Sequence, residues 1–299
     1  MTAVSSPNGI HDCGDGLFLI DLDLPREGFR NFISAWLYIE EGTVLLVDCG
    51  PSATYEKLRA SLRKLSIEKL DALLLTHIHL DHAGAAGLVV KDFSPCVICH
   101  PKGIPHLVAP KKLEQAAQKV LGDLACAYGP VSPVFPHMLT FQAEMNIGGI
   151  YIRALDTPGH APHHLCFLVN DLLFAGEMCG VSYPIEGGYL RPATPPPFRY
   201  EEYRSSLSRV SDTPARLICL GHYGCYPEPK AMLKAALRQL DLWVETIRKD
   251  GGKGDWQSYF DALIIRDPLL SRFSALPPDI QKRELFFIAN SIKGISALA

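Results

Sequence analysis

The sequence predicts an α/β protein whose chain ends in helices. Within the first fifty residues, apolar side chains alternate and then run together, which is typical of strands separated by turns. A helical stretch then leads into a short apolar run, and this order of strand, helix and strand indicates an α/β fold. Beyond residue 226 the apolar spacing is only helical. In the 299-residue chain the first strands are expected at 17–22, 34–40 and 43–48.

The first expected helix follows Pro51. Its apolar residues recur at three- and four-residue spacing and therefore share one face. These residues are Tyr55, Leu58, Leu62 and Leu65. The continuous apolar segment 71–76 is expected to form a buried strand. A helix at 82–91, a strand at 94–100 and a helix at 110–127, ended by Gly129-Pro130, complete this half.

Strands are expected to resume between residues 138 and 174, with turns at Gly148-Gly149 and Asn170-Asp171. The proline-rich loop 191–198 precedes a helix at 200–210 and a last strand at 216–221. We therefore expect two units, residues 1–226 with the strands and residues 227–299 as a C-terminal helical subdomain. The helices of this subdomain are expected at 227–249, 255–265 and 278–297.

The charge and the cysteine content exclude several classes of protein. The 29 Lys and Arg against 32 Asp and Glu give a net charge of −3, which argues against a nucleic-acid partner. The nine cysteines are odd in number and irregularly spaced, as is typical of reduced thiols in a cytosol. The N-terminus lacks the pattern of a secretory signal, and the apolar runs are too short to span a bilayer. We therefore expect a cytoplasmic protein without a membrane anchor.

The strongest chemical signal is THIHLDHAG, residues 76–84, where the predicted buried strand 71–76 ends and a helix begins. His77, His79, Asp81 and His82 place three imidazoles and a carboxylate within six residues. Side chains two apart in an extended segment point the same way, so His77 and His79 can hold one metal ion together. The turn into the helix directs Asp81 and His82 toward the position of a second metal ion. Nitrogen and oxygen ligands of this kind suit Zn²⁺, Fe or Mn²⁺.

This segment resembles the HxHxDH motif of the metallo-β-lactamase superfamily. Later motifs match the family in the same order, each at an expected strand end: TPGH with His160, LLFAGE with Glu177, and ICLGH with His222. The earlier VDCG resembles the family's first motif, in which Asp48 would brace the histidine loop. The resemblance covers roughly residues 17–226. It implies a four-layer αβ/βα sandwich with a metal site at one edge of the two sheets.

The resemblance also implies a ligand set. His77, His79 and His160 would hold a first metal ion. A second ion would be held by Asp81, His82 and His222. Glu177 stands where the family usually has an aspartate that bridges both ions. Because glutamate is one methylene longer, it would bridge the ions, bind one of them, or support another ligand. We therefore expect two divalent ions, with Zn²⁺ favoured over Fe or Mn, and a mononuclear site as the alternative.

The resemblance predicts a hydrolase of the glyoxalase II-like or lactonase-like branch. A metal-bound hydroxide would attack a small lactone, ester or thioester, and Asp81 would orient the nucleophile or carry its proton. Tyr183 lies where lactonase-like members place a phenol that hydrogen-bonds the developing oxyanion. One alternative is a mononuclear iron oxygenase that acts on a thiol or persulfide, and another is a non-catalytic metal-binding protein.

Weaker features have both structural and functional interpretations. His164 resembles a second histidine of glyoxalase-type members and would support the metal ligands, or it packs within a strand. Tyr183 and Tyr223 are candidates for substrate-side groups or for packing residues. The loop 191–198 suits a pocket rim or a simple connector. Cys96 and Cys99 form a CxxC segment that is expected to supply core thiols. The aromatic residues of the C-terminal helices would form a core, a homodimer contact or a lid over the pocket.

Overall fold

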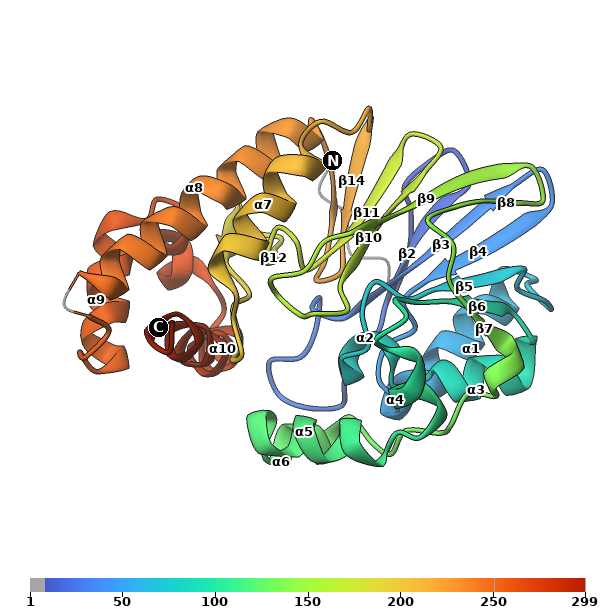
Figure 1. The fold of residues 1–299 in the computed structure, drawn as a ribbon, viewed down its shortest axis with the longest axis horizontal. Helices are drawn as coiled ribbons and strands as arrows, with labels where there is room; N and C mark the ends of the chain where they lie inside the picture. The colour runs from blue at the N-terminus through green and yellow to red at the C-terminus, as the bar shows by residue number, and fades with distance from the viewer. Residues whose placement is uncertain (1–8, 250, 299) are drawn as a thin grey trace.

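Two β-sheets lie face to face between layers of helices (Figure 1). The computed structural model describes residues 9–249 and 251–298. The first sheet has seven strands in sequence order, and β4, β5 and β6 run parallel to one another. Its strands are β1 (Ile10–Asp12), β2 (Leu17–Asp21), β3 (Ser34–Glu40), β4 (Thr43–Val47), β5 (Ala72–Leu74), β6 (Cys96–Ile98) and β7 (Leu139–Thr140).

The second sheet has six strands in the order β15-β14-β11-β10-β9-β8. Strands β11 and β14 are parallel, and β9 shares their direction because β10 is antiparallel to both β9 and β11. A separate two-stranded ribbon, β12 (Val181–Tyr183) with β13 (Tyr189–Arg191), follows β11. The strands of the second sheet are β8 (Glu144–Ile147), β9 (Ile150–Asp156), β10 (Leu165–Val169), β11 (Leu172–Gly176), β14 (Leu217–Leu220) and β15 (Cys225–Pro227).

The helices cover the outer faces of both sheets, with α1 and α3 against the first sheet and α7 and α8 against the second (Figure 1). The α-helices are α1 (Tyr55–Lys64), α2 (Leu80–Ala83), α3 (Ala86–Phe93), α4 (Ile104–Val108), α5 (Lys111–Leu121), α6 (Asp123–Ala127), α7 (Tyr200–Val210), α8 (Pro229–Arg248), α9 (Trp256–Arg266) and α10 (Pro278–Ser296). Short 3-10 turns lie at Ser52–Thr54, Pro136–Met138 and Leu270–Ala275.

Three buried clusters define four layers. One cluster joins the first sheet to α1 and α3, a second joins the two sheets through residues such as Trp36 and Phe167, and a third joins the second sheet to α7, α8 and α10. The burial follows the alternation of each strand, since successive side chains point to opposite faces. The predicted four-layer αβ/βα sandwich with helices at the C-terminal end is therefore confirmed.

Two predicted helices are each divided in the structure. The segment 110–127 breaks at Gly122, whose φ of +56° and ψ of −130° lie outside the helical region and favour glycine. The segment 82–91 divides into α2 and α3 around residues 84 and 85. Strand β1, helix α4 and the β12–β13 ribbon had no counterpart in the predicted elements. They are short, and short elements carry little periodicity.

Helix α10 packs closely on the chain that follows the β12–β13 ribbon. The Thr194 hydroxyl donates to the carbonyl oxygen of Ser291 at 3.0 Å. A Cβ atom at Gly294 would lie 1.9 Å from the carbonyl oxygen of Thr194, so only glycine permits this approach. The third buried cluster contains residues from both the second sheet and α10. Among the described residues, none of the helices has the length and apolar character needed to cross a membrane.

Candidate metal centre

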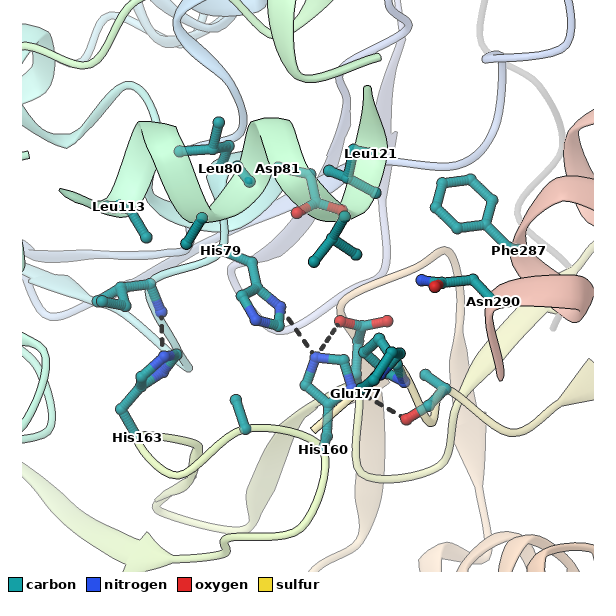
Figure 2. A pocket seen from close by; sticks show the side chains of 18 of the residues that line it. His79, Leu80, Asp81, Leu113, Leu121, His160, His163, Glu177, Phe287 and Asn290 are labelled. Atoms are coloured by element: carbon teal, nitrogen blue, oxygen red, sulfur yellow. Dashed lines mark hydrogen bonds and ion pairs between the residues drawn. The ribbon is translucent and has the colours of Figure 1, made fainter. Parts of the chain in front are cut away.

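The predicted ligands all follow strands whose carboxyl ends meet at one edge of the sandwich. Five of them line a cavity there (Figure 2), namely His79, Asp81, His160, Glu177 and His222. His77 comes just after β5, His160 after β9, Glu177 after β11 and His222 after β14. The loops at the carboxyl ends of parallel strands can carry polar ligand side chains while the strands themselves stay apolar. The structure therefore brings together residues that lie up to 145 positions apart, from 77 to 222.

Asp48 holds the histidine segment in place from the end of β4. One carboxylate oxygen accepts a hydrogen bond from the Thr76 backbone N–H at 2.8 Å, and the other accepts from the Thr76 hydroxyl at 2.7 Å. His82 Nδ1 lies 2.8 Å from the same second oxygen. This carboxylate therefore fixes both the backbone before His77 and the ring of His82, which is the bracing role that the sequence predicts for Asp48.

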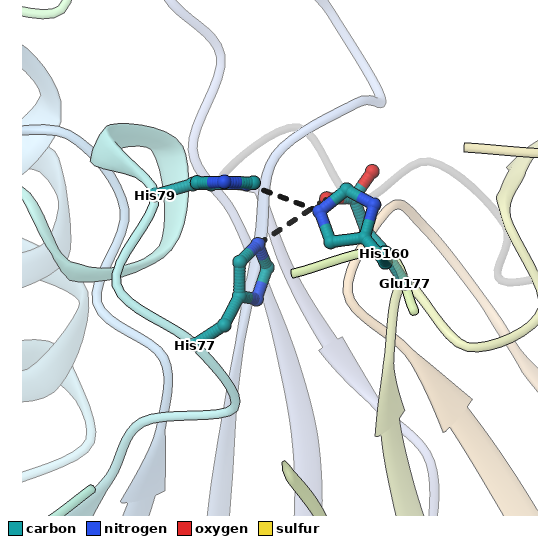
Figure 3. A group of neighbouring side chains, drawn as sticks. All are labelled: His77, His79, His160 and Glu177. Atoms are coloured by element: carbon teal, nitrogen blue, oxygen red, sulfur yellow. Dashed lines mark hydrogen bonds and ion pairs between the residues drawn. The ribbon is translucent and has the colours of Figure 1, made fainter. Parts of the chain in front are cut away.

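The first group of ligands contains His77, His79, His160 and Glu177, whose candidate ligand atoms lie within 4.8 Å of one another. Figure 3 shows these four side chains pointing toward one another, with His77 and His79 on one segment and His160 and Glu177 on others. Glu177 Oε2 lies 2.8 Å from His160 Nε2 and 3.3 Å from His77 Nε2. His160 Nε2 also lies 3.0 Å from His79 Nδ1.

The second group contains Asp81, His82 and His222, again with candidate ligand atoms within 4.8 Å of one another. His222 Nε2 lies 3.6 Å from Asp81 Oδ2. It also lies 3.3 Å from Oε1 of Glu177, which is the oxygen that does not face His77 and His160. The other oxygen, Oε2, also lies 3.7 Å from His82 Nε2, so the carboxylate of Glu177 lies between the two groups and is close to imidazoles of both.

Backbone carbonyl groups determine which ring nitrogen of His160 and of His222 remains available to bind a metal ion. His160 Nδ1 lies 3.0 Å from the carbonyl oxygen of Ala193, and His222 Nδ1 lies 3.0 Å from that of Phe32. Because a carbonyl oxygen only accepts, each Nδ1 carries a proton, which leaves Nε2 as the nitrogen that can bind a metal ion. Such second contacts orient the histidines of metal sites.

The electrostatics of the centre fit a bound cation. His77 and His82 are buried, and among the described residues neither Nε2 atom has a hydrogen-bond partner. Burial would raise the pKa of Glu177, but His160 and His222 hold that pKa well below its usual value. Burial and then the neighbouring His82 keep the pKa of His77 well below its usual value, so this ring is neutral. The neutral imidazole of His77 and the ionised carboxylate of Glu177 are donors that suit a divalent metal ion.

His164 supports Glu177 and does not belong to either ligand group. Its Nε2 accepts a hydrogen bond from the Glu177 backbone N–H at 3.2 Å, and its Nδ1 lies 2.8 Å from the Thr157 hydroxyl. The Tyr203 hydroxyl donates to the Glu177 carbonyl oxygen at 2.6 Å. Both backbone polar groups of Glu177 are therefore fixed. Of the two roles predicted for His164, the geometry favours the supporting one.

The cavity beside the ligands has a volume of about 350 Å³. Its far walls come from α5, from the proline-rich loop through Pro195, Pro196 and Pro197, and from α10 through Phe287 and Asn290 (Figure 2). The loop 191–198 therefore contributes to the pocket rim, and one aromatic residue of the C-terminal helices contributes to the wall.

Tyr128 is a lining residue that the sequence patterns did not indicate. Its side chain is only 1% exposed, and among the described residues its hydroxyl has no hydrogen-bond partner. Burial, and then Asp81 and Glu177, raise the pKa of Tyr128 well above its usual value, so the phenol keeps its proton. An unpaired buried hydroxyl is costly, which suggests a ligand partner for it. No local motif marks Tyr128, because α6 brings it to the site from a distant part of the chain.

Tyr183 and Tyr223 are buried but do not line this cavity. The ring of Tyr183 on β12 packs with the guanidinium carbon of Arg283 at 5.5 Å from its centroid. Tyr223 belongs to the cluster between the two sheets. The geometry therefore offers no support for Tyr183 as a hydrogen-bond donor to the substrate. Cys96 and Cys99 belong to neither ligand group found among the described residues.

A four-layer αβ/βα sandwich with this ordered set of ligands defines the metallo-β-lactamase class of proteins. The sequence profile of the Metallo-beta-lactamase superfamily matches residues 28–222. The chain belongs to this superfamily, as the HxHxDH resemblance predicts.

Individual relatives agree with this assignment. The metallo-beta-lactamase fold-containing protein ST1585 of Sulfurisphaera tokodaii is 30% identical over 220 residues, which cover 70% of this chain and 83% of that protein. The crystal structure of ST1585, described there as from Sulfolobus tokodaii, superposes with a TM-score of 0.71 at 24% identity over 94% of this chain and 98% of that chain. This structural likeness supports the fold.

Two further relatives carry the names of enzymes. The atrochrysone carboxyl ACP thioesterase of Aspergillus fumigatus is 28% identical over 181 residues, or 60% of this chain and 46% of that enzyme. The hydroxyacylglutathione hydrolase of Xylella fastidiosa is 26% identical over 199 residues, or 66% of this chain and 62% of that enzyme. The match thus spans less than two thirds of each of these two enzymes.

Proposed function

We propose that the chain is a metal-dependent hydrolase that cleaves a small lactone, ester or thioester. One observation carries the proposal: the carboxylate of Glu177 lies between two groups of candidate ligands and is close to imidazoles of both, beside a cavity large enough for a small substrate. The names of the two relatives, a thioesterase and a hydroxyacylglutathione hydrolase, support acyl hydrolysis as the class of reaction.

We propose two divalent metal ions, with Zn²⁺ favoured. His77, His79 and His160 would hold the first, Asp81, His82 and His222 would hold the second, and Glu177 would bridge them. Divalent metal at this place would supply a nucleophile at neutral pH by lowering the pKa of a water molecule to about 7.

Side chains that line the cavity would carry out the remaining steps of the hydrolysis. Hydrolysis joins the oxygen of water to the acyl carbon and breaks the bond to the alcohol or thiol, which leaves with a proton. Asp81 lines the cavity and is partly exposed, so its carboxylate can orient the attacking water and pass on its proton. The Tyr128 phenol, protonated and unpartnered, can donate to the carbonyl oxygen as negative charge develops on it.

The proposal is tested on protein purified from its own host. We expect two metal ions per chain by elemental analysis, and turnover of at least one substrate in a panel of lactones, esters and thioesters. A chelator should abolish this turnover and added Zn²⁺ should restore it. One iron per chain with oxygen uptake would instead favour the oxygenase alternative. Metal-replete protein that turns over none of the panel would favour the non-catalytic one.

Tyr128→Phe tests the phenol. We expect kcat to fall about a hundredfold, because loss of one donor to a developing oxyanion has an effect of this order. KM and metal content should change little, since the ring remains and Tyr128 is in neither ligand group. Steady-state kinetics on the reconstituted enzyme measure both constants. Tyr151→Phe is the control, because Tyr151 is 44% exposed and does not line the cavity. An unchanged kcat in Tyr128→Phe would contradict the role.

A further inference from the structure

One wall of the cavity is an apolar face of α5. Five of the six α5 residues that line it are apolar, and their spacing of three and four residues places them on one side of the helix. These are Leu113, Ala116, Ala117, Val120 and Leu121. Figure 2 shows Leu113 and Leu121 on the opposite side of the cavity from His160 and Glu177.

This face is incompletely covered by the protein itself. Leu113, at 9% exposure, is the only buried residue of α5, and Val120 is 39% exposed. A helix in a globular protein normally turns its apolar stripe toward the core, whereas here the stripe borders an open cavity. An apolar ligand would remove this surface from water, which is favourable in proportion to the area covered.

The other walls are also largely uncharged. Pro195, Pro196 and Pro197 lie on one side, and Phe287 of α10 lies near them. Apart from histidines, two cationic side chains line the cavity. Arg191 is already paired with the buried carboxylate of Glu284.

Lys112, the other cation, is an exposed residue at the start of α5. A substrate part with several charges, such as a glutathionyl group, would lose hydration here without gaining matching partners. The carboxylates and imidazoles of the metal centre are confined to the opposite side.

We propose that the substrate carries an extended, uncharged, unbranched acyl chain, which lies along the α5 face while its carbonyl group meets the metal centre. This inference rests on the proposed function and narrows it. The chain would contact Val120 and Leu121 on one side and the proline-rich loop and Phe287 on the other.

The test uses N-acetylcysteamine thioesters with acetyl, butyryl, hexanoyl and octanoyl chains. We expect kcat/KM to rise about fourfold for each added methylene until the cavity is filled. This factor corresponds to the transfer free energy of burying one methylene. Val120→Asp should lower the ratio of octanoyl to acetyl kcat/KM about tenfold or more, because the chain would then lie against a carboxylate.

Gln115→Asp is the matched control. It adds the same carboxylate to α5 at an exposed position that does not line the cavity, so the ratio should stay at the wild-type value. A wild-type enzyme that hydrolyses all four thioesters at similar kcat/KM would overturn the proposal and leave the hydrolase function standing. An equal effect of both substitutions would also overturn it.

A second measurement separates this inference from the hydrolase proposal. Butan-1-ol, hexan-1-ol and octan-1-ol, which the protein cannot hydrolyse, are titrated calorimetrically into the metal-replete protein. Affinity that rises with chain length and is lost in Val120→Asp, but not in Gln115→Asp, supports the apolar chain site even if the thioesters are not hydrolysed. Affinity that is independent of chain length contradicts the site.

Discussion

Asp81→Asn is expected to lower kcat/KM by about 10³-fold or more while the protein stays folded. The amide has nearly the same size as the carboxylate but lacks its negative charge and cannot take up a proton. Asp81 Oδ2 lies 3.6 Å from His222 Nε2 and 4.0 Å from His82 Nε2, so the second ligand group would lose its carboxylate. Kinetics on metal-reconstituted protein, with elemental analysis of the same samples, measure the effect.

Asp171→Asn is the control for this substitution. Asp171 pairs with Arg216 at 2.8 Å on the surface, where both side chains are about half exposed, and it lies in neither ligand group. Its kcat/KM should match that of the wild type. Circular dichroism of both variants checks the fold. If Asp81→Asn kept activity within about tenfold of the wild type, the roles assigned to Asp81 would be wrong.

Glu284→Gln is expected to lower the free energy of unfolding by about 3–5 kcal/mol. Glu284 is fully buried in α10 and accepts hydrogen bonds from Arg191 Nε, from Arg283 Nε at 2.9 Å and from the Tyr189 hydroxyl at 2.9 Å. One carboxylate thus balances two buried guanidinium groups. The amide would leave both cations uncompensated, which is far more costly than the loss of a surface ion pair. Urea unfolding at pH 7 measures the change.

Glu245→Gln is the control, because Glu245 pairs with Arg266 at 2.7 Å where both side chains are well exposed. Such a pair contributes about 0–1 kcal/mol. A similarly small effect of Glu284→Gln would show that the buried cluster does not stabilise the fold.

The pH dependence of the stability follows from the carboxyl group of Glu284. Burial opposes ionisation of Glu284, but Arg191 and Arg283 outweigh it and lower its pKa to about 2. Since the pKa falls on folding, the stabilisation is complete above the unfolded value of about 4.3 and is lost as the pH falls toward 2. The difference in stability between the wild type and Glu284→Gln should therefore be constant near neutral pH and shrink between about pH 4 and pH 2.

The candidate metal ligands could be identified from the sequence because their signals are local. His77, His79, Asp81 and His82 lie within six residues, and His160, Glu177 and His222 each end an apolar strand. Strand ends are readable from periodicity, and the family resemblance supplies their order. The bracing role of Asp48 was also predicted from the family resemblance.

The cavity could be predicted only in part. The loop 191–198 was a candidate for its rim and the C-terminal helices for a lid, whereas the wall from α5 was not predicted, because only packing brings these segments together. Tyr128 reaches the site because the chain breaks at Gly122 and starts a second short helix. Tyr183 was expected at the substrate, but the β12–β13 ribbon turns it toward Arg283. No local sequence pattern indicates that Tyr128 lines the cavity and that Tyr183 does not.

The two parts of the site have separate origins in the chain. Every predicted metal ligand follows a strand of the sandwich and precedes residue 223, whereas α5 and α10 supply walls without supplying a ligand. Mutations that accumulate in α5 or α10 can therefore remodel what the cavity accepts and leave the ligands untouched. For a gene that has been duplicated, this separation provides a short evolutionary route to a new substrate, in which the reaction is inherited and only its specificity has to be selected.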